Sequence, residues 1–371
     1  MKKVCLLFLL CFAAGLSAAP PSVAETILSG QRALVLGNGY VKATLVPGTM
    51  GALAGLYWIP GKAELFNPYS YTRTTINELL PDQQSVTFWG NRTLFWNGTV
   101  LFYQPLNDVR TKIGDSSASV AMTGRFIGGF PVAMTRRVTL EEDAALLKIE
   151  VAVSNFGKAP QEIRLWEHLV PSPGGAVPDV SLICGPGVRR LGRYQDTEKH
   201  RGGFLLDTFK DGNLNRFIVP GSDWIAATGG NTTVFLRTAA ENLAEDGFFY
   251  TQKDAASKLH TVEMLLRRFT LKPGKSRTFE LELGVLSGLA VLRRLSGSHG
   301  FDFSRDGNEL TWHASTVRVS PAAKCVVSAG DWRHDFVIPA LAPGQCVSGK
   351  ISNAPALSDD AFTFTVRPVS R

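Results

Sequence analysis

Short runs in which apolar and polar residues alternate, separated by turn residues, make up most of the chain. The run from Leu146 to Ser154 shows the pattern best. Every second residue from Leu147 to Val153 is aliphatic, and the residues between them are charged or small. Side chains of a β-strand alternate between its two faces, so this spacing predicts a strand with one buried face.

The strand from Leu146 is predicted to turn and return. Asn155–Gly157 is a turn signal, because glycine readily adopts the backbone conformations that tight turns need. The chain comes back through Ile163 and Leu165 to Trp166–His168, and a Pro- and Gly-rich stretch then breaks the pattern. The sequence therefore predicts a central hairpin whose second arm ends on an indole, a carboxylate and an imidazole.

The same short-strand pattern runs along the rest of the chain and predicts an all-β protein. Ser287–Ser296 is the best helix candidate, and it is short. Short strands with frequent turns and almost no helix are typical of a two-sheet antiparallel β-sandwich. Strands are expected within residues 27–60, 117–126, 132–140, 217–228, 234–238, 261–270 and 277–286.

The pattern also divides the chain into domains. We expect a large β domain over residues 25–296, a linker over 297–307 and a small β-sandwich domain over 308–371. Cys325 and Cys346 in the small domain are expected to form a disulfide, and closing that loop would contribute about 3 kcal/mol. Cys184 in the large domain is expected to be a buried thiol.

The first 24 residues are interpreted as a secretory signal peptide, with two lysines, an apolar stretch and then small residues. Cleavage is expected after Ala24, and cleavage after Ala18 is the alternative. The apolar run is too short to span a bilayer comfortably, and no later segment is apolar enough. We therefore expect an exported protein, periplasmic or extracellular, with no membrane span in the mature chain.

Charge and motifs narrow the function classes. The formal net charge is +7, but lysines and arginines are scattered, whereas nucleic-acid binding would require a clustered basic patch. Weak attraction to anionic polymers, including acidic polysaccharides, remains open. The sequence contains no phosphate loop, dinucleotide fingerprint, zinc-protease helix or hydrolase nucleophile elbow. We expect no cofactor and no metal ion.

His168 is the candidate catalytic residue, because it alone among the histidines ends a well-defined strand beside a carboxylate and a tryptophan. Glu167 and His168 should point to opposite faces of a regular strand and therefore cannot form a coupled acid–base pair. An imidazole and a carboxylate from another strand could together open a sugar ring by general acid–base catalysis. The candidate partners, among which the sequence does not decide, are Asp246, Glu263, Glu280 and Glu282.

Aromatic residues between Val86 and Gln104 suggest a ligand. Most of these rings are expected to fill the sandwich core. Trp89 and Trp96, however, lie beside turns and could line a groove in which sugars stack on the rings while their hydroxyl groups bind polar partners. The expected sugar-binding residues are Trp89, Trp96, Trp166, Arg73 and Asn91.

Three segments together resemble the galactose mutarotase-like (aldose epimerase-like) superfamily: GNGYVKATLVPGTMGALAGLYWIPGKAELFNP, MTRRVTLEEDAALLKIEVAVSNFGKAPQEIRLWEHLVPSPGG and FTLKPGKSRTFELELGV. The resemblance implies a large two-sheet supersandwich and places His168 where aldose epimerases carry their catalytic acid. The chain departs from those enzymes in having Glu167-His168 before a Pro-Gly loop, and so looks nearest to uncharacterised bacterial members. Residues 336–351 resemble Ig-like modules of bacterial adhesion proteins.

The expected function is that of an exported carbohydrate-binding protein, accessory to sugar or polysaccharide processing. Fold alone does not settle activity. One alternative is an enzyme, either a sugar epimerase or a polysaccharide lyase or hydrolase. Another is a structural or adhesion protein of the cell envelope that uses the small domain.

Overall fold

The computed structural model describes most of the chain. The described residues are 19–66, 71–75, 84–88, 90–95, 105–126, 130–175, 181–184, 189–190, 205–208, 214–254, 259–358 and 361–368. Within these ranges the structure consists of strands and one short 3-10 helix, η4 (Ala240–Asn242), and contains no helix long and apolar enough to cross a membrane.

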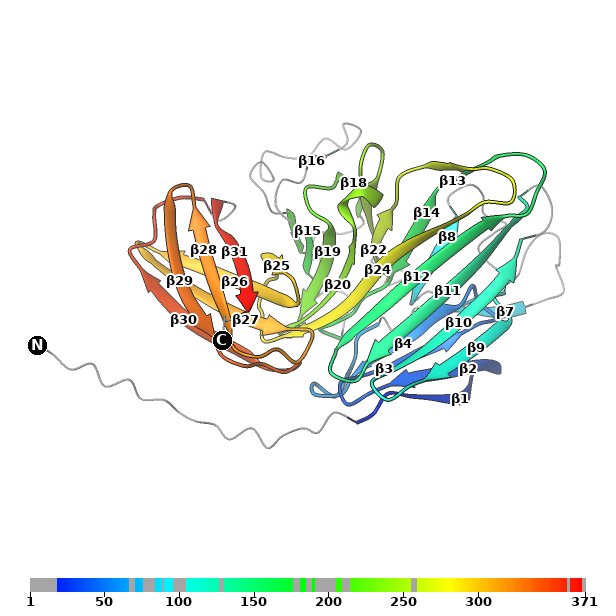
Figure 1. Ribbon diagram of the computed structural model, residues 1–371, viewed down its shortest axis with the longest axis horizontal. Coiled ribbons are helices and arrows are strands. Elements are labelled where there is room, and N and C mark those ends of the chain that lie inside the picture. Colours follow the sequence, from blue (N-terminus) through cyan, green and yellow to red (C-terminus); the bar gives the residue numbers. More distant parts are fainter. Residues whose placement is uncertain are drawn as a thin grey trace, which may run out of the picture.

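Two large antiparallel sheets form the main body, and they confirm the predicted all-β sandwich (Figure 1). The eleven-stranded sheet consists, in spatial order, of β1 (Ser22–Leu28), β2 (Gln31–Gly37), β3 (Val41–Val46), β4 (Ala52–Trp58), β8 (Asn91–Phe95), β14 (Leu165–Leu169), β22 (Leu259–Leu265), β21 (Phe248–Asp254), β18 (Leu214–Val219) and β16 (Arg189–Arg190), with β5 (Ala63–Glu64) beside β4.

The nine-stranded sheet lies across the core from it. In spatial order it consists of β17 (Leu205–Thr208), β15 (Ser181–Cys184), β19 (Trp224–Gly229), β20 (Thr232–Thr238), β24 (Ser276–Ser287), β12 (Leu146–Asn155), β11 (Val132–Glu141), β10 (Ser117–Arg125) and β9 (Asp108–Ile113). Two further pairs are β6 (Tyr71–Thr75) with β7 (Gln84–Phe88), and β13 (Gln161–Ile163) with β23 (Phe269–Leu271).

The predicted strand from Leu146 is confirmed, but the predicted hairpin is wrong. β12 pairs with β11 and β24 in the nine-stranded sheet, whereas β14 pairs with β8 and β22 in the other sheet. The turn after β12 therefore carries the chain between sheets. Asn155 holds this crossing, because its side-chain amide donates to the carbonyls of Ala159 and Leu271, each at 2.8 Å.

Alternation along each strand produces the main core. On β12, Leu147, Ile149, Val151 and Val153 are each at most 1% exposed and pack in one large apolar cluster shared by the two sheets. Burying a side chain of this size contributes roughly 1.5–3 kcal/mol. The pattern read from the sequence therefore positions the inner face of the nine-stranded sheet.

A small β-sandwich lies against one end of this body (Figure 1). One of its sheets has the order β25 (Arg294–Ser296), β26 (His299–Asp306), β27 (Glu309–Thr316) and β30 (Cys346–Ser352). The other has the order β29 (Trp332–Ile338), β28 (Ala323–Ala329) and β31 (Thr363–Pro368). We call residues 294–368 the small module.

Two sequence-based expectations fail at its start. Residues 297–307, predicted to be a linker, contain β26, and the segment predicted to be a helix ends in β25. The reason is packing. Leu289 and Leu292 join Leu146 and Phe235 of the large sandwich in a separate apolar cluster that closes the junction, which we call the junction cluster.

The predicted disulfide is absent, because both cysteines are free thiols. Cys325 is buried in the core of the small module, where burial raises the pKa of its thiol to about 12. Cys346 belongs to the other sheet and packs against the junction cluster, with its thiol donating to the carbonyl of Gly288 at 3.3 Å. The two thiols therefore serve different cores. The side chain of Cys184, on β15, lies outside the described part.

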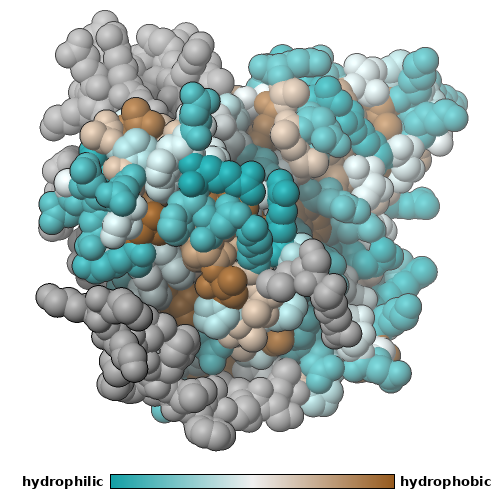
Figure 2. Space-filling model, turned by 60° about the vertical axis from the view of Figure 1, so that its left-hand side comes forward, coloured by the Kyte–Doolittle hydropathy of each residue, from teal (hydrophilic) through white to brown (hydrophobic). Residues whose placement is uncertain are grey.

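Most described apolar residues that reach the surface stand alone. Ile27, Ile113 and Val337 are 69%, 59% and 62% exposed and lie on strands of three different sheets. Figure 2 shows hydrophilic side chains over much of one face of the molecule, with apolar ones scattered between them. Single exposed apolar residues are ordinary and do not by themselves mark a binding surface.

Candidate functional site

Neighbouring residues of β14 serve the two faces of the eleven-stranded sheet. Glu167 points into the core between the sheets, where it pairs with Arg136 of β11. Trp166 and His168 point to the opposite face, as the alternation of a strand requires. The sequence-based expectation that Glu167 and His168 do not act as a pair agrees with this geometry.

Glu167 belongs to a buried polar group inside the sandwich. Its carboxylate lies 3.2 Å from the Arg136 guanidinium, and both side chains are at most 1% exposed. Asn91 and Thr93 donate to the same carboxylate at 2.7 and 2.5 Å. Burial lowers the pKa of Arg136, while the charge of Glu167 and the hydrogen bond to it raise that pKa. Glu167 thus ties the sheets together.

His168 meets Glu263 on the other face. Strand register places Glu263 of β22 directly opposite His168, and the imidazole Nε2 lies 3.7 Å from the carboxyl Oε1. The two side chains are 2% and 1% exposed. Trp166 completes this corner, because its indole Nε1 donates to Glu263 Oε2 at 2.5 Å and its ring lies edge-on to the imidazole, with centroids 5.7 Å apart.

Residues of two neighbouring strands lie beside His168 and Glu263 on the same face of the sheet. Arg92 of β8 is the register partner of His168 on one side, and Tyr250 of β21 is the register partner of Glu263 on the other. Residues opposite one another in a sheet share a face. We call Arg92, Trp166, His168, Tyr250 and Glu263 the outer-face cluster.

Burial sets the electrostatics of this cluster. It raises the pKa of Glu263 to about 8, although hydrogen bonds from Thr261 and Trp166 and the charge of Arg92 act in the opposite direction. A buried carboxyl group favours its neutral form because the anion loses its hydration. At neutral pH Glu263 can therefore hold a proton and donate it, as well as accept a hydrogen bond through its other oxygen.

Of the four carboxylates that the sequence offered as partners of His168, the structure places Glu263 there. Glu280 and Glu282 lie on β24 of the other sheet. Asp246 forms an ion pair with Arg164 at 3.2 Å and another with Arg268 at 3.3 Å.

The predicted sugar-binding residues are distributed differently from the expectation. Trp166 lies in the outer-face cluster and is partly buried. Asn91 is fully buried on the inner face, beside Glu167. Arg73 lies on β6 with its side chain outside the described part, and Trp89 and Trp96 lie outside the described residues.

The sequence did not identify Arg92 or Tyr250 as site residues. Each lies on the outward-facing side of its own strand. What brings them together is the alignment of β8, β14, β22 and β21, which joins residues far apart in the chain. Among the described residues there is no group of three or more His, Cys, Asp or Glu placed to hold a metal ion.

Solved structures share this architecture. A galactose mutarotase-like protein from Clostridium acetobutylicum is 12% identical, with 72% of this chain and 99% of that chain covered and a TM-score of 0.51. A provisionally assigned aldose 1-epimerase from Klebsiella pneumoniae is 11% identical, with 72% and 83% covered and a TM-score of 0.53. A TPR-domain containing protein from Parabacteroides distasonis is 14% identical, with 69% of this chain and 47% of that chain covered and a TM-score of 0.52.

These similarities define the class of fold. At such low identities they establish the architecture, and the chain has a galactose mutarotase-like fold, as its sequence segments suggested. The chain matches no protein-family model and none of the curated proteins.

Proposed function

We propose that the protein binds carbohydrate at the outer-face cluster. The observation that carries this proposal is the arrangement of Trp166 over His168 and Glu263. A partly buried indole offers an apolar face, and the imidazole and carboxyl groups beside it offer hydrogen bonds. A sugar presents the matching chemistry, with C–H groups on a ring face and hydroxyl groups around its edge.

The distance between His168 and Glu263 favours binding over catalysis. Opening a sugar ring requires an acid at the ring oxygen and a base at the anomeric hydroxyl, so the two groups must reach different atoms of the substrate. Here Nε2 and Oε1 are 3.7 Å apart, and Trp166 also holds the carboxyl group. The two side chains therefore lie close together rather than on either side of a sugar ring.

A sugar epimerase is the second candidate, and the raised pKa of Glu263 favours it. A carboxyl group with a pKa of about 8 holds a transferable proton at neutral pH, which is what a general acid needs. In this case a bound sugar would have to separate Glu263 from His168. The similarity in fold also supports this candidate, since one of the similar structures is provisionally assigned as an aldose 1-epimerase.

A glycan array followed by calorimetric titration of the best hit tests the first candidate. Trp166→Ala and His168→Ala should each weaken binding about ten- to a hundredfold, as expected for loss of a stacking face or of a hydrogen bond to a charged or buried partner. His334→Ala, which removes an exposed imidazole on β29, is the matched control and should bind normally. Absence of any hit among neutral and acidic glycans would reject carbohydrate binding.

Polarimetry separates the two candidates. The wild-type protein should leave the spontaneous mutarotation of α-D-glucose and α-D-galactose unchanged if it only binds sugars. Acceleration that disappears in both His168→Ala and Glu263→Gln would instead identify an epimerase.

The proposal includes export. The signal-like first residues support it, as does an accessory role for a binding protein in sugar or polysaccharide processing outside the cytoplasm. Recovery of the chain, shortened at its N-terminus, from the periplasmic or culture fraction is the expected result. Full-length chain confined to the cytoplasm would contradict export.

A further inference from the structure

The outer face of the nine-stranded sheet is hollowed where β11, β12 and β24 run side by side. The hollow measures about 470 Å³, which lies in the size range of small-molecule pockets. It is on the opposite sheet from the outer-face cluster and is separated from it by the main core. We call it the charged trough. Its charged lining residues are Arg137, Glu141, Lys148, Glu150, Glu280 and Glu282.

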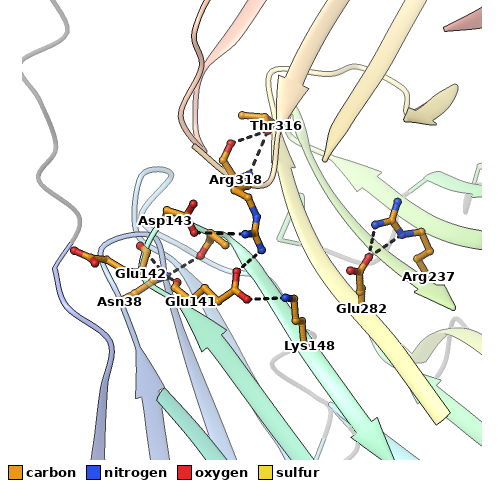
Figure 3. A network of polar contacts seen from close by, with 10 residues as sticks. Asn38, Glu141, Glu142, Asp143, Lys148, Arg237, Glu282, Thr316 and Arg318 are labelled. Carbon is orange, nitrogen blue, oxygen red and sulfur yellow. Dashed lines mark hydrogen bonds and ion pairs between the residues drawn. The ribbon is translucent and has the colours of Figure 1, made fainter. Parts of the chain in front are cut away.

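Ion pairs organise most of these charges. Arg137 pairs with Glu150 at 2.8 Å, and Lys148 pairs with Glu141 at 2.6 Å. Figure 3 shows the second of these pairs, and beside it the pair between Glu282 and Arg237 of β20. Glu141 also pairs with Arg318 (Figure 3). Each basic group in and around the trough therefore already has a carboxylate partner, so an anionic ligand would have to displace those contacts.

Glu280 is the exception. Its side chain is exposed, and it makes no ion pair with any residue in the described part of the chain. In strand register it stands directly opposite Glu150, another carboxylate. Like charges placed opposite one another in a sheet repel, so this position leaves negative charge available in a hollow of a molecule whose formal net charge is +7.

We propose that the charged trough is a second binding site, which takes a hexosamine-sized ligand bearing one primary ammonium group. The ammonium is placed between Glu280 and Glu150, where it gives Glu280 a cationic partner. The ring hydroxyls accept from Arg137 and Lys148 and donate to Thr139, which also lines the trough. The site uses no residue of the outer-face cluster and does not depend on that cluster's function.

The competing occupants fit less well. A metal ion would need several carboxylate oxygens converging on one point, and the described residues hold no such group. An apolar ligand would have to cover charged side chains without compensating them. A small polyhydroxylated amine compensates the carboxylates and uses the remaining donors.

Calorimetric titration of the chain from Ala19 to Arg371 with D-glucosamine, and separately with N-acetyl-D-glucosamine, tests the proposal. The two sugars share a ring, but the second lacks the ammonium charge. D-glucosamine should bind at least about fivefold more tightly, a gain that matches an exposed ion pair and that salt should reduce. Equal binding of the two sugars, or no binding of either, overturns the proposal.

Variants locate the site. Glu280→Gln should weaken D-glucosamine binding about fivefold, whereas Glu241→Gln, which neutralises an exposed carboxylate on η4, should leave it unchanged. His168→Ala should also leave it unchanged, which distinguishes the trough from the outer-face cluster. Loss of binding in His168→Ala with retention in Glu280→Gln overturns the assignment.

Discussion

At the scale of single residues, burial of Glu263 couples stability to pH. Its pKa is raised from 4.5 to about 8 in the folded protein, so the folded state holds the proton more tightly than the unfolded state does. The contribution of this group to stability is therefore fully present below about pH 4.5 and is lost as the pH rises through 8. Each unit of pKa difference corresponds to about 1.4 kcal/mol.

Glu263→Gln removes the titration and keeps an acceptor for the Trp166 indole. We expect the melting temperature of the wild-type protein, relative to this variant, to fall between about pH 4.5 and pH 8 and to level off above that range. Thermal unfolding followed by circular dichroism at several pH values measures the difference. Parallel profiles for the two proteins would show that the folded and unfolded pKa values of Glu263 are alike.

The same residues show which features of the site can be predicted from the sequence and which cannot. Alternation along β14 was enough to separate Glu167 from His168, because a strand has only two faces. It could not select Glu263, since that requires β22 to pair with β14 across more than ninety positions of chain. Nor could it show that Asn91 faces inward with Glu167, because the order in which β4, β8 and β14 pair is a property of the whole sheet.

At the scale of elements, β1 bears on where the proposed signal peptide would end. β1 begins at Ser22, and its first three residues pair with Gly37, Leu36 and Val35 of β2. Cleavage after Ala24 would remove these three residues from the edge of the eleven-stranded sheet. Cleavage after Ala18 would leave the strand whole. If the chain is exported as proposed, we therefore expect it to begin at Ala19.

The intact mass of the protein recovered from the periplasmic or culture fraction measures this directly. A mass that corresponds to a chain starting at Ala19 is the expected result, and a chain starting at Glu25 would show that the pairing of residues 22–24 is dispensable. An Ala18→Arg variant should accumulate uncleaved precursor, because signal processing requires a small residue at this position.

The elements that were predicted wrongly share one cause. The apolar residues of 287–296 were interpreted from local spacing as a helix, but they face apolar side chains of the large sandwich that are distant in sequence. A short apolar run cannot be assigned from its period alone. Gly300 shows the same effect in the supposed linker, since a Cβ there would lie 2.3 Å from Leu286 Cδ1. Packing against residues distant in the sequence therefore determines the structure of both segments.

At the scale of the whole molecule, the small module is fixed to the large sandwich by two kinds of contact. The junction cluster joins Leu146, Phe235 and Leu286 of the large sheet to Leu289 and Leu292. Beside it, Arg318 follows β27 and forms an ion pair with Glu141 of β11 (Figure 3). The apolar contacts dominate the stability of this junction, because a partly exposed ion pair contributes at most about 1 kcal/mol.

Ending the chain at Ser287 would uncover Leu146, Phe235 and Leu286, each at most 5% exposed in the full chain. Losing the burial of three such side chains costs roughly 5–9 kcal/mol at most, which is comparable to the whole stability of an ordinary domain. We expect the truncated chain to be insoluble or to unfold at a much lower urea concentration, and the full chain to unfold in one transition.

Leu292→Ala in the full chain tests the same contact if the truncated chain cannot be purified. This substitution should lower the free energy of unfolding by about 2–5 kcal/mol. Val337→Ala, at an exposed position of the small module, is its control. Two separate unfolding transitions in the full chain, or a truncated chain as stable as the whole, would show that the modules are independent. Only independent modules would suit an adhesion domain carried on a flexible linker.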